Sequence, residues 1–328
     1  MVVVERFRSH KKQNWAGKRM NIKKFYFIVN KSAGNGKAGS FWYRLRKRLD
    51  ERGINYIAVD THCPGHAEKL AIDICRTEKN DEIALVAVGG DGTIHEVING
   101  LSDFPGVPVG FLPAGSGNDF ARGFTHESDP LMALDKILST INLATYDMGA
   151  YRLAESVGLR TFASTFGIGF DAEVSRVTNE SSYKRWLNKI KLGRVAYIVS
   201  VVRLVFSYVP QDIELVVDER KMSFNRTWLV AVSNIPFMGG GMMVNPSARP
   251  NDGLLDVCVV HNMNRFKLLV LFPLIYGGKH IRYKEVKILR GEKITVTSRH
   301  PITAHADGEI VGSTPVSITV QPGIRKVI

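Results

Sequence analysis

Three glycine-rich segments contain the residues whose types and spacing are best suited to binding a phosphorylated ligand. They span residues 30–39, 89–93 and 113–119, and each follows a short apolar run that predicts a buried strand. Glycine lets backbone N–H groups approach phosphate oxygens because no Cβ stands in the way. Loops at the carboxyl ends of parallel strands line one crevice, so we expect the three segments to face a common ligand.

The first segment, NKSAGNGKAG at residues 30–39, is ambiguous. Gly34, Gly36 and Gly39 form G-x-G-x-x-G before a predicted helix, and Asp60 ends the next predicted strand, which is the context of a dinucleotide-binding fingerprint. However, three residues separate the strand from the first glycine, and no Lys-Ser or Lys-Thr pair follows Gly39 as it would in a P-loop. The segment indicates either a phosphate on a helix N-terminus or an ordinary strand-to-helix turn.

The second segment, GGDGT at residues 89–93, is more specific. Thr93 is placed to cap the following helix, whereas Asp91 would repel phosphate in the anion pocket unless a cation accompanied it. Mg²⁺ resolves that conflict, because it binds carboxylate and phosphate oxygens together. The alternative is that Asp91 is a simple turn residue.

The third segment, PAGSGND at residues 113–119, offers Ser116 and Asn118 as polar contacts near a helix start. Asn118 or Asp119 would serve equally well as an ordinary N-cap.

Alternating strands and helices must position these loops. The pattern predicts strands at 25–30, 54–60, 82–88 and 107–112, and helices at 39–52, 65–77 and 93–101. Alternation at this spacing is typical of right-handed βαβ units and a mostly parallel sheet.

The second half of the chain is rich in predicted strands. They lie at 161–166, 213–217, 228–232, 255–260, 286–289, 294–297, 302–306 and 316–320, with helical stretches near 170–178, 183–208 and 265–276. The sequence therefore predicts an α/β domain followed by a β-rich domain, with the cleft between them as a natural ligand site.

Composition narrows the class of protein. The 328 residues are 45% hydrophobic and 23% charged, which is ordinary globular material. The net charge is +13, and about half of it comes from eight basic residues and one acid within residues 1–24. The remaining surplus suits a phosphate-rich ligand or an anionic membrane and does not by itself argue for nucleic acid. We expect residues 1–19 to be a disordered basic extension.

No segment predicts a membrane span or a signal peptide. Cys63, Cys75 and Cys258 form no metal-ligand spacing and no disulfide set, which favours the reducing cytosol.

Several motifs together resemble the soluble bacterial diacylglycerol kinase family of lipid kinases, whose wider relatives include sphingosine kinases. They are GGDGT (89–93), PAGSGNDFA (113–121), GIGFDA (167–172), NDGLLDV (251–257) and DGE (307–309), with TxxxGHA at 61–67. The resemblance covers residue 22 to the C-terminus. It implies a nucleotide-binding α/β domain over 20–145, joined by about 316–328 as the chain end returns, and a β-sandwich lipid domain over 146–315.

The resemblance also implies site residues. Glu309 would be the general base, and Asp91 would hold the catalytic Mg²⁺ through a water network. Asp252, with the backbone carbonyls of Arg249 and Leu254, would form a second, structural Mg²⁺ site. Contacts to ATP would come from Asn30, Lys31, Ser32, Ala33, Gly34, Thr61, Gly90, Asp91, Gly92, Thr93, Ile94, His95, Glu96 and Ser116.

Two positions depart from the family pattern. Lys31 stands where proline is common, which loosens that turn, and Ser116 stands where threonine is usual. Neither change removes a chemical group that phosphoryl transfer requires. Glu309 would add roughly 10²–10⁴ in rate as a base, and a plain turn residue is the alternative.

The predicted function is ATP- and Mg²⁺-dependent phosphorylation of a lipid hydroxyl, with diacylglycerol as the favoured acceptor. Phosphatidylglycerol, undecaprenol and a sphingoid base remain open, and an NAD kinase sharing GGDGT is the nearest rival. A dinucleotide-dependent oxidoreductase and a non-catalytic basic module explain fewer of the motifs. We expect a cytoplasmic protein peripherally associated with the membrane and without a nucleic-acid partner. A homodimer and a monomer both remain open. The basic and aromatic residues of 183–194 would bind anionic headgroups or form a solvated helix face.

Overall fold

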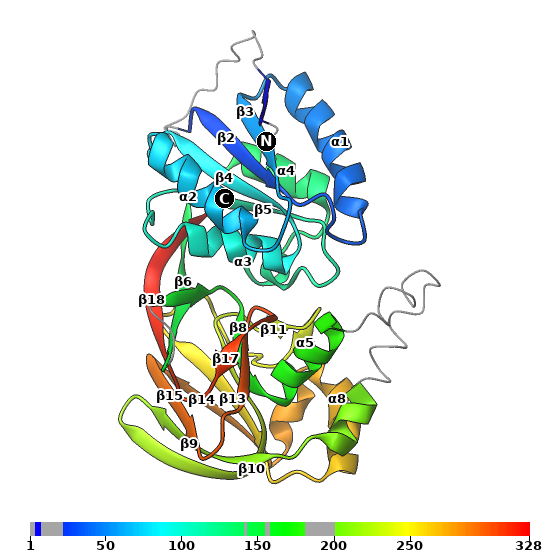
Figure 1. Ribbon diagram of the computed structural model, residues 1–328, viewed down its shortest axis with the longest axis vertical. Coiled ribbons are helices and arrows are strands. Elements are labelled where there is room, and N and C mark those ends of the chain that lie inside the picture. The colour runs from blue at the N-terminus through cyan, green and yellow to red at the C-terminus, as the bar shows by residue number, and fades with distance from the viewer. Residues whose placement is uncertain (1–3, 8–21, 141–142, 155–157, 181–200) are drawn as a thin grey trace. The chain divides into compact units, whose positions relative to one another are not determined.

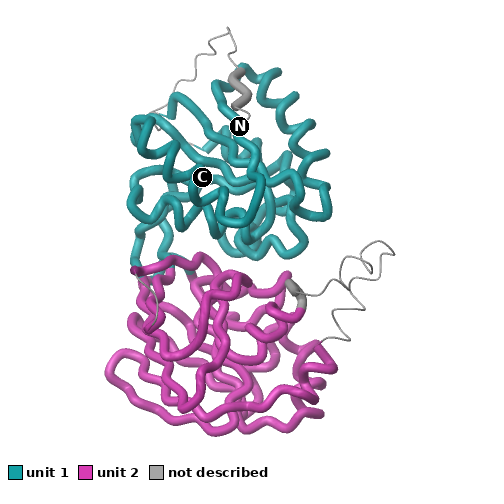
Figure 2. Tube along the Cα trace, in the orientation of Figure 1, with its two compact units in different colours: residues 1–148, 250–252, 321–328 teal, residues 149–249, 253–320 magenta. Residues whose placement is uncertain are grey.

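The computed structural model describes residues 4–7, 22–140, 143–154, 158–180 and 201–328. The chain forms two compact units, coloured separately in Figure 2. Unit 1 comprises residues 1–148, 250–252 and 321–328, and unit 2 comprises residues 149–249 and 253–320. The predicted helical and basic stretch at 183–194 lies outside the described residues.

Unit 1 is built on a parallel sheet, as the alternating pattern predicts. Its strands, in the order β3-β2-β4-β5, are β3 (Tyr56–Asp60), β2 (Lys24–Val29), β4 (Ile83–Gly89) and β5 (Val109–Pro113). Each neighbouring pair in that order is parallel. The connecting helices are α1 (Lys37–Glu51), α2 (His66–Thr77) and α3 (Asp91–Gly100) (Figure 1).

The core of unit 1 explains why these elements form where they do. Helix α1 buries Ala38, Trp42, Leu45 and Leu49, which share one helical face. Trp42 packs against Phe27 of β2, with ring centroids 5.3 Å apart. The chain end returns here, since Val327 pairs with Val109 of β5 and Ile328 joins the same core.

Two features of unit 1 differ from the sequence expectations. Residues 1–19 were expected to be disordered, but Val4–Phe7 form β1, an antiparallel partner of β3. Helix α4 (Pro130–Ser139) was not expected. Its start is fixed by Asp129, whose carboxylate accepts hydrogen bonds from the N–H groups of Leu131 and Met132, so an N-cap followed by proline was the available signal.

Unit 2 is an antiparallel β-sandwich, which confirms the predicted fold class. The strand order β18-β15-β9-β10-β8-β16-β17 is extended by β13 and β14 from β10, and by β6 and β7 at β18. The bounds are β6 (Ala144–Leu153), β7 (Arg160–Phe162), β8 (Thr165–Gly169), β9 (Gln211–Val217), β10 (Arg220–Ser233), β13 (Leu255–His261), β14 (Val286–Gly291), β15 (Lys293–Ser298), β16 (Thr303–Ala306), β17 (Glu309–Ser313) and β18 (Val316–Val327).

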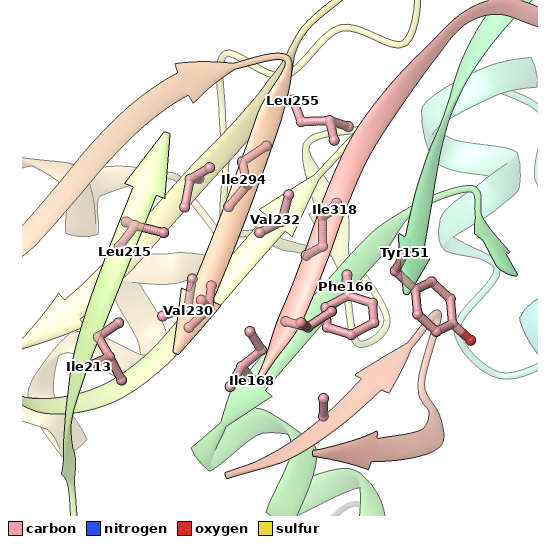
Figure 3. Packing of buried hydrophobic residues seen from close by; sticks show 14 of the residues in the cluster. Tyr151, Phe166, Ile168, Ile213, Leu215, Val230, Val232, Leu255, Ile294 and Ile318 are labelled. Carbon is pink, nitrogen blue, oxygen red and sulfur yellow. The ribbon is translucent and has the colours of Figure 1, made fainter. Parts of the chain in front are cut away.

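Long strand β10 organises this sandwich. Its first half, Arg220–Phe224, pairs with β9, whereas Leu229–Ser233 pair with β8 on one side and β13 on the other. Apolar side chains from these strands fill the interior shown in Figure 3, including Val230, Val232 and Phe166.

Helices and short elements complete unit 2. They are α5 (Phe170–Glu180), α8 (Arg265–Ile275), the 3₁₀ turn η2 (Lys279–Arg282) and the small hairpin of β11 (Phe237–Met238) and β12 (Met242–Met243). A second buried cluster packs α5, α8 and residues 201–205 against the sheet. No helix among the described residues is long and apolar enough to cross a bilayer.

The single strand expected at 161–166 is wrong in detail, because the structure breaks it into β7 and β8. At the break, the carboxylate of Asp307 accepts the N–H groups of Ala163, Ser164 and Thr165 at 2.8–3.1 Å. A side chain distant in sequence thus binds the backbone N–H groups at the point where the strand is interrupted.

Candidate active site

The three glycine loops meet at the carboxyl edge of the unit 1 sheet, as the sequence predicts. The N–H of Ala114 donates to the carbonyl of Gly89 at 2.7 Å. A Cβ on Gly34, whose φ is +59°, would lie 2.3 Å from the oxygen of Ala114, and one on Gly115 would lie 2.5 Å from the Cα of Gly90. Only glycine permits such approaches, so the loops form one continuous backbone surface.

Asn30 joins the first loop to the second. Its Nδ2 donates to Oγ1 of Thr93 at 3.2 Å, and its Oδ1 accepts the N–H of Ser32 at 3.2 Å. Exposed Lys31 reaches across to Asp60, with Nζ 2.5 Å from Oδ2. Asp60 therefore pairs with a side chain of the protein, so its position at the end of β3 does not require the ribose contact of a dinucleotide-binding fold.

Asp91 is the first residue of α3 and lies beside the end of the third loop. Its Oδ1 accepts the N–H of Phe120 at 3.1 Å, and the side chain is half-buried. The carboxylate thus ties the second loop to the third while remaining at the N-terminal end of a helix, where the dipole favours negative charge.

The remaining predicted contacts of the second loop divide into two groups. Gly90 and Gly92 are partly exposed, whereas Thr93, Ile94 and His95 are buried at 6%, 2% and 6% exposure. Because the side chains of Thr93, Ile94 and His95 are buried, these residues would contact a ligand through their backbone atoms.

The third loop is closed by its own asparagine. Oδ1 of Asn118 accepts the N–H of Gly115 at 3.0 Å, and its Nδ2 donates to the carbonyl of Gly115 at 3.2 Å. Arg122 pairs with buried Asp119 at 3.1 Å. Ser116 stands exposed at the loop tip, where its hydroxyl is accessible.

Glu96 has a structural partner that the sequence did not reveal. Its Oε1 accepts the N–H of Gly65 at 2.8 Å and its Oε2 accepts that of Ala67 at 2.9 Å. Both oxygens cap helix α2 and so hold the segment that contains Thr61, whose own N–H donates to Val29 at 2.9 Å.

Glu309 lies in unit 2, as the first residue of β17, and is exposed. It follows a two-residue turn in which Asp307 and Gly308 have φ of +52° and +93°. Such a turn joins adjacent antiparallel strands, and Ala306 pairs directly with Glu309. An Asp-Gly pair between two short strands is itself a hairpin signal. The motif did not reveal that the Asp307 carboxylate binds the break after β7, or that the His305 ring binds the N–H of Gly308.

The predicted structural Mg²⁺ residues lie on one surface loop. Asp252 and Arg249 are exposed and Leu254 is half-buried. Among the described residues, no three His, Cys, Asp or Glu side chains gather as a metal-binding group. The predicted set has one carboxylate and two backbone carbonyls and so needs no such group of side chains, and this site stays a prediction.

The geometry of unit 1 suits a nucleotide phosphate accompanied by a cation. The loops approach so closely that a Cβ on Gly34 or Gly115 would meet the backbone of a neighbouring loop, and the carboxylate of Asp91 borders them. Close-packed loops bordered by a carboxylate are an arrangement that a nucleotide-binding phosphotransferase requires.

Comparison with known proteins identifies the family. The diacylglycerol kinase catalytic domain matches residues 24–150, and the "YegS C-terminal NAD kinase beta sandwich-like domain" matches residues 164–328. The Bacillus subtilis protein named "Putative lipid kinase YtlR" is 32% identical over 91% of this chain and 97% of its own length. A diacylglycerol kinase of Mycobacterium tuberculosis is 28% identical over 95% of this chain and 96% of its own length.

Solved structures agree on the fold. A Bacillus anthracis protein described as a "putative diacylglycerol kinase" superposes with a TM-score of 0.76 at 24% identity, covering 97% of this chain and 98% of that one.

The chain belongs to the diacylglycerol kinase family of lipid kinases, and membership of a kinase family implies use of ATP.

Proposed function

We propose that this protein transfers the γ-phosphate of Mg-ATP to the free hydroxyl of diacylglycerol, forming phosphatidic acid. The observation that carries the proposal is the meeting of three glycine loops around Asp91. Relatives named diacylglycerol kinase along nearly the whole chain support this choice of acceptor.

Unit 1 would bind the nucleotide. Backbone N–H groups of the glycine loops and the N-terminus of α3 would hold the phosphates. When bound, Mg²⁺ neutralises charge on the phosphate oxygens, and Asp91 is the residue that would hold it. Asn30 and Asn118 keep the loops in shape, so the donor phosphate is oriented without reorganisation of the backbone.

Glu309 would act on the acceptor. Its exposed carboxylate accepts the proton of the lipid hydroxyl as that oxygen forms a bond to the γ-phosphorus. The bond from the γ-phosphorus to the bridging oxygen breaks, and ADP leaves with that oxygen. The chemistry is in-line phosphoryl transfer assisted by a general base.

The test is transfer of labelled γ-phosphate from Mg-ATP to lipids in mixed micelles. The panel contains diacylglycerol, phosphatidylglycerol, undecaprenol, a sphingoid base and NAD⁺. Asp91→Asn and Glu309→Gln are expected to lower kcat for diacylglycerol by about 10²-fold or more. Asp103→Asn and Glu219→Gln, exposed acids in units 1 and 2, are the matched controls.

Each other outcome rejects part of the proposal. Label on another lipid replaces diacylglycerol as the acceptor, and label on NAD⁺ alone makes the protein an NAD kinase. If Asp91→Asn or Glu309→Gln keeps the full rate, the role given to that residue is wrong.

We also propose that unit 2 binds the surface of an anionic phospholipid bilayer through α8. Its exposed face presents Phe266 and Val270, at 72% and 65% exposure, and exposed Tyr276 follows at the end of the helix. Phe206 and Phe266 are in ring contact, with centroids 6.1 Å apart. We call these four residues the α8 apolar surface.

The basic residues around this surface indicate an anionic bilayer as its partner. Residues 201–210 and 262–284 contain no Asp or Glu, but they include Arg203, Lys279, Arg282 and Lys284, all exposed. An exposed apolar helix face with a basic rim is the pattern of a helix that lies in a membrane interface.

Sedimentation with vesicles tests this proposal. Phe266→Ser combined with Val270→Ser should weaken binding to phosphatidylglycerol vesicles about tenfold or more, because two large apolar side chains leave the lipid. Tyr43→Ser, which removes an equally exposed aromatic of unit 1, is the control. Unchanged vesicle binding with loss of a dimer in gel filtration would make the surface a contact between two copies.

A further inference from the structure

A buried pair in unit 2 stands next to the turn that carries Glu309. His305 of β16 is 2% exposed and Asp171 of α5 is 9% exposed. Nε2 of His305 lies 3.2 Å from Oδ2 of Asp171. Both side chains lie against Gly167 of β8. A Cβ at that position would be 2.0 Å from Oδ2 of Asp171 and 2.3 Å from Nε2 of His305. The fold therefore leaves space for this pair and for no side chain at position 167.

The other ring nitrogen of His305 binds the turn itself. The N–H of Gly308 lies 3.1 Å from Nδ1 of His305. A backbone N–H can only donate, so Nδ1 must be the acceptor and the ring hydrogen must be on Nε2. That hydrogen points to Asp171, which thereby fixes the tautomer that Gly308 requires.

Two side chains thus hold the turn. Asp307 binds three backbone N–H groups at the break between β7 and β8, and His305 binds Gly308 from within the hairpin. Glu309 follows Gly308 directly, so the direction of its carboxylate depends on a backbone fixed at both preceding residues. A general base must be held within about 0.5 Å of its productive position.

We propose that His305 is a positioning residue for Glu309, and that Asp171 sets the tautomer in which His305 does so. The inference rests on the proposed function, because it assumes that Glu309 is the base. It concerns groups that do not themselves touch the reacting atoms.

Two substitutions of His305 test the pair. His305→Leu removes both hydrogen bonds and should lower kcat for lipid phosphorylation roughly tenfold or more, a part of what a general base contributes. His305→Gln should restore most of the rate, because its amide oxygen can accept from Gly308 while its NH₂ donates to Asp171. KM for ATP should not change in either variant, and unfolding midpoints identify any variant that does not fold.

A double-mutant cycle with Glu309→Gln separates positioning from a general structural role. If His305 acts through Glu309, then His305→Leu has almost no further effect on kcat once Glu309 has been replaced. Equal losses in both backgrounds, or a folded His305→Gln as slow as His305→Leu, would overturn the proposal. A wild-type chain that phosphorylates no lipid would instead reject the proposed function.

Discussion

Two acidic residues near the candidate catalytic ones use their carboxylate oxygens to accept hydrogen bonds from backbone N–H groups. Glu96 caps α2 with both oxygens, and Asp307 accepts three N–H groups. A buried or half-buried N–H without a partner costs about 1–3 kcal/mol, so these carboxylates stabilise the irregular segments that surround the site. Under the proposed function, Asp91 and Glu309 are the acids with a chemical role in phosphoryl transfer.

His280 gives a prediction at the residue scale. It is 1% exposed, and its Nε2 donates to the carbonyl of Val244 at 2.8 Å. Burial lowers its pKa below the usual 6.5. As the pH falls below 6.5, the unfolded chain takes up the proton first, so the free energy of unfolding should fall between pH 7 and pH 5.

Denaturant unfolding at pH 7.5 and 5.5 measures this effect. His280→Gln, which can keep the bond to Val244, should lose less stability across that range than the wild type. Exposed His300→Gln is the control and should behave as the wild type. Burial also lowers the pKa of His261, so some slope should remain. Parallel slopes for wild type and His280→Gln would show that His280 does not carry the effect.

At the scale of elements, the strand-to-helix connections decide the shape of the nucleotide site. Parallel β2, β4 and β5 end at one edge of the sheet, so loops far apart in sequence meet there. The alternation of strands and helices predicted this edge and the three loops. It did not predict that Gly90 and Gly115 would touch, because contact between two loops depends on how their strands pair.

The contact of Gly90 with Gly115 gives a prediction at this scale. In Gly115→Ala the new Cβ would lie 2.5 Å from the Cα of Gly90, and a backbone atom cannot rotate away. The loops must separate, so we expect a loss of about 1–3 kcal/mol in unfolding free energy and weaker binding of ATP. Gly106→Ala is the control, because nothing lies within 4 Å of its Cβ. Calorimetric titration with ATP would reject the idea if the two variants bound equally.

At the scale of the whole molecule, the chain completes its first unit with its last residues. Ile328 is 5% exposed and packs in the core that contains Trp42 and Leu134, and its N–H donates to Val109 at 3.0 Å. Arg325, fully buried, donates to the carbonyls of Leu101 and Phe104.

Truncation of Ile328 gives a prediction at the scale of the whole molecule. Ile328→Ala should destabilise unit 1 by about 2 kcal/mol, at the lower end for a buried isoleucine because the site is at a chain end. Hydrogen exchange should rise in β5 and α4 but not in β10 or β13 of unit 2. Ile310→Ala, a half-exposed isoleucine of unit 2, is the matched control. Exchange that rises equally in both units would contradict the assignment of Ile328 to the core of unit 1.

Local features could be predicted from the sequence: apolar periodicity indicated most of the strands and helices, although not β1 or α4, and glycine spacing indicated the loops that suit a phosphate. The motifs it contains were enough to predict the family and the α/β plus β-sandwich architecture. Tertiary structure alone decided which side chains meet: Glu96 with α2, Asp307 with the break after β7, and His305 with Asp171. Those contacts join residues up to 144 positions apart, and no local pattern encodes them, because each depends on how helices and strands distant in the sequence pack together.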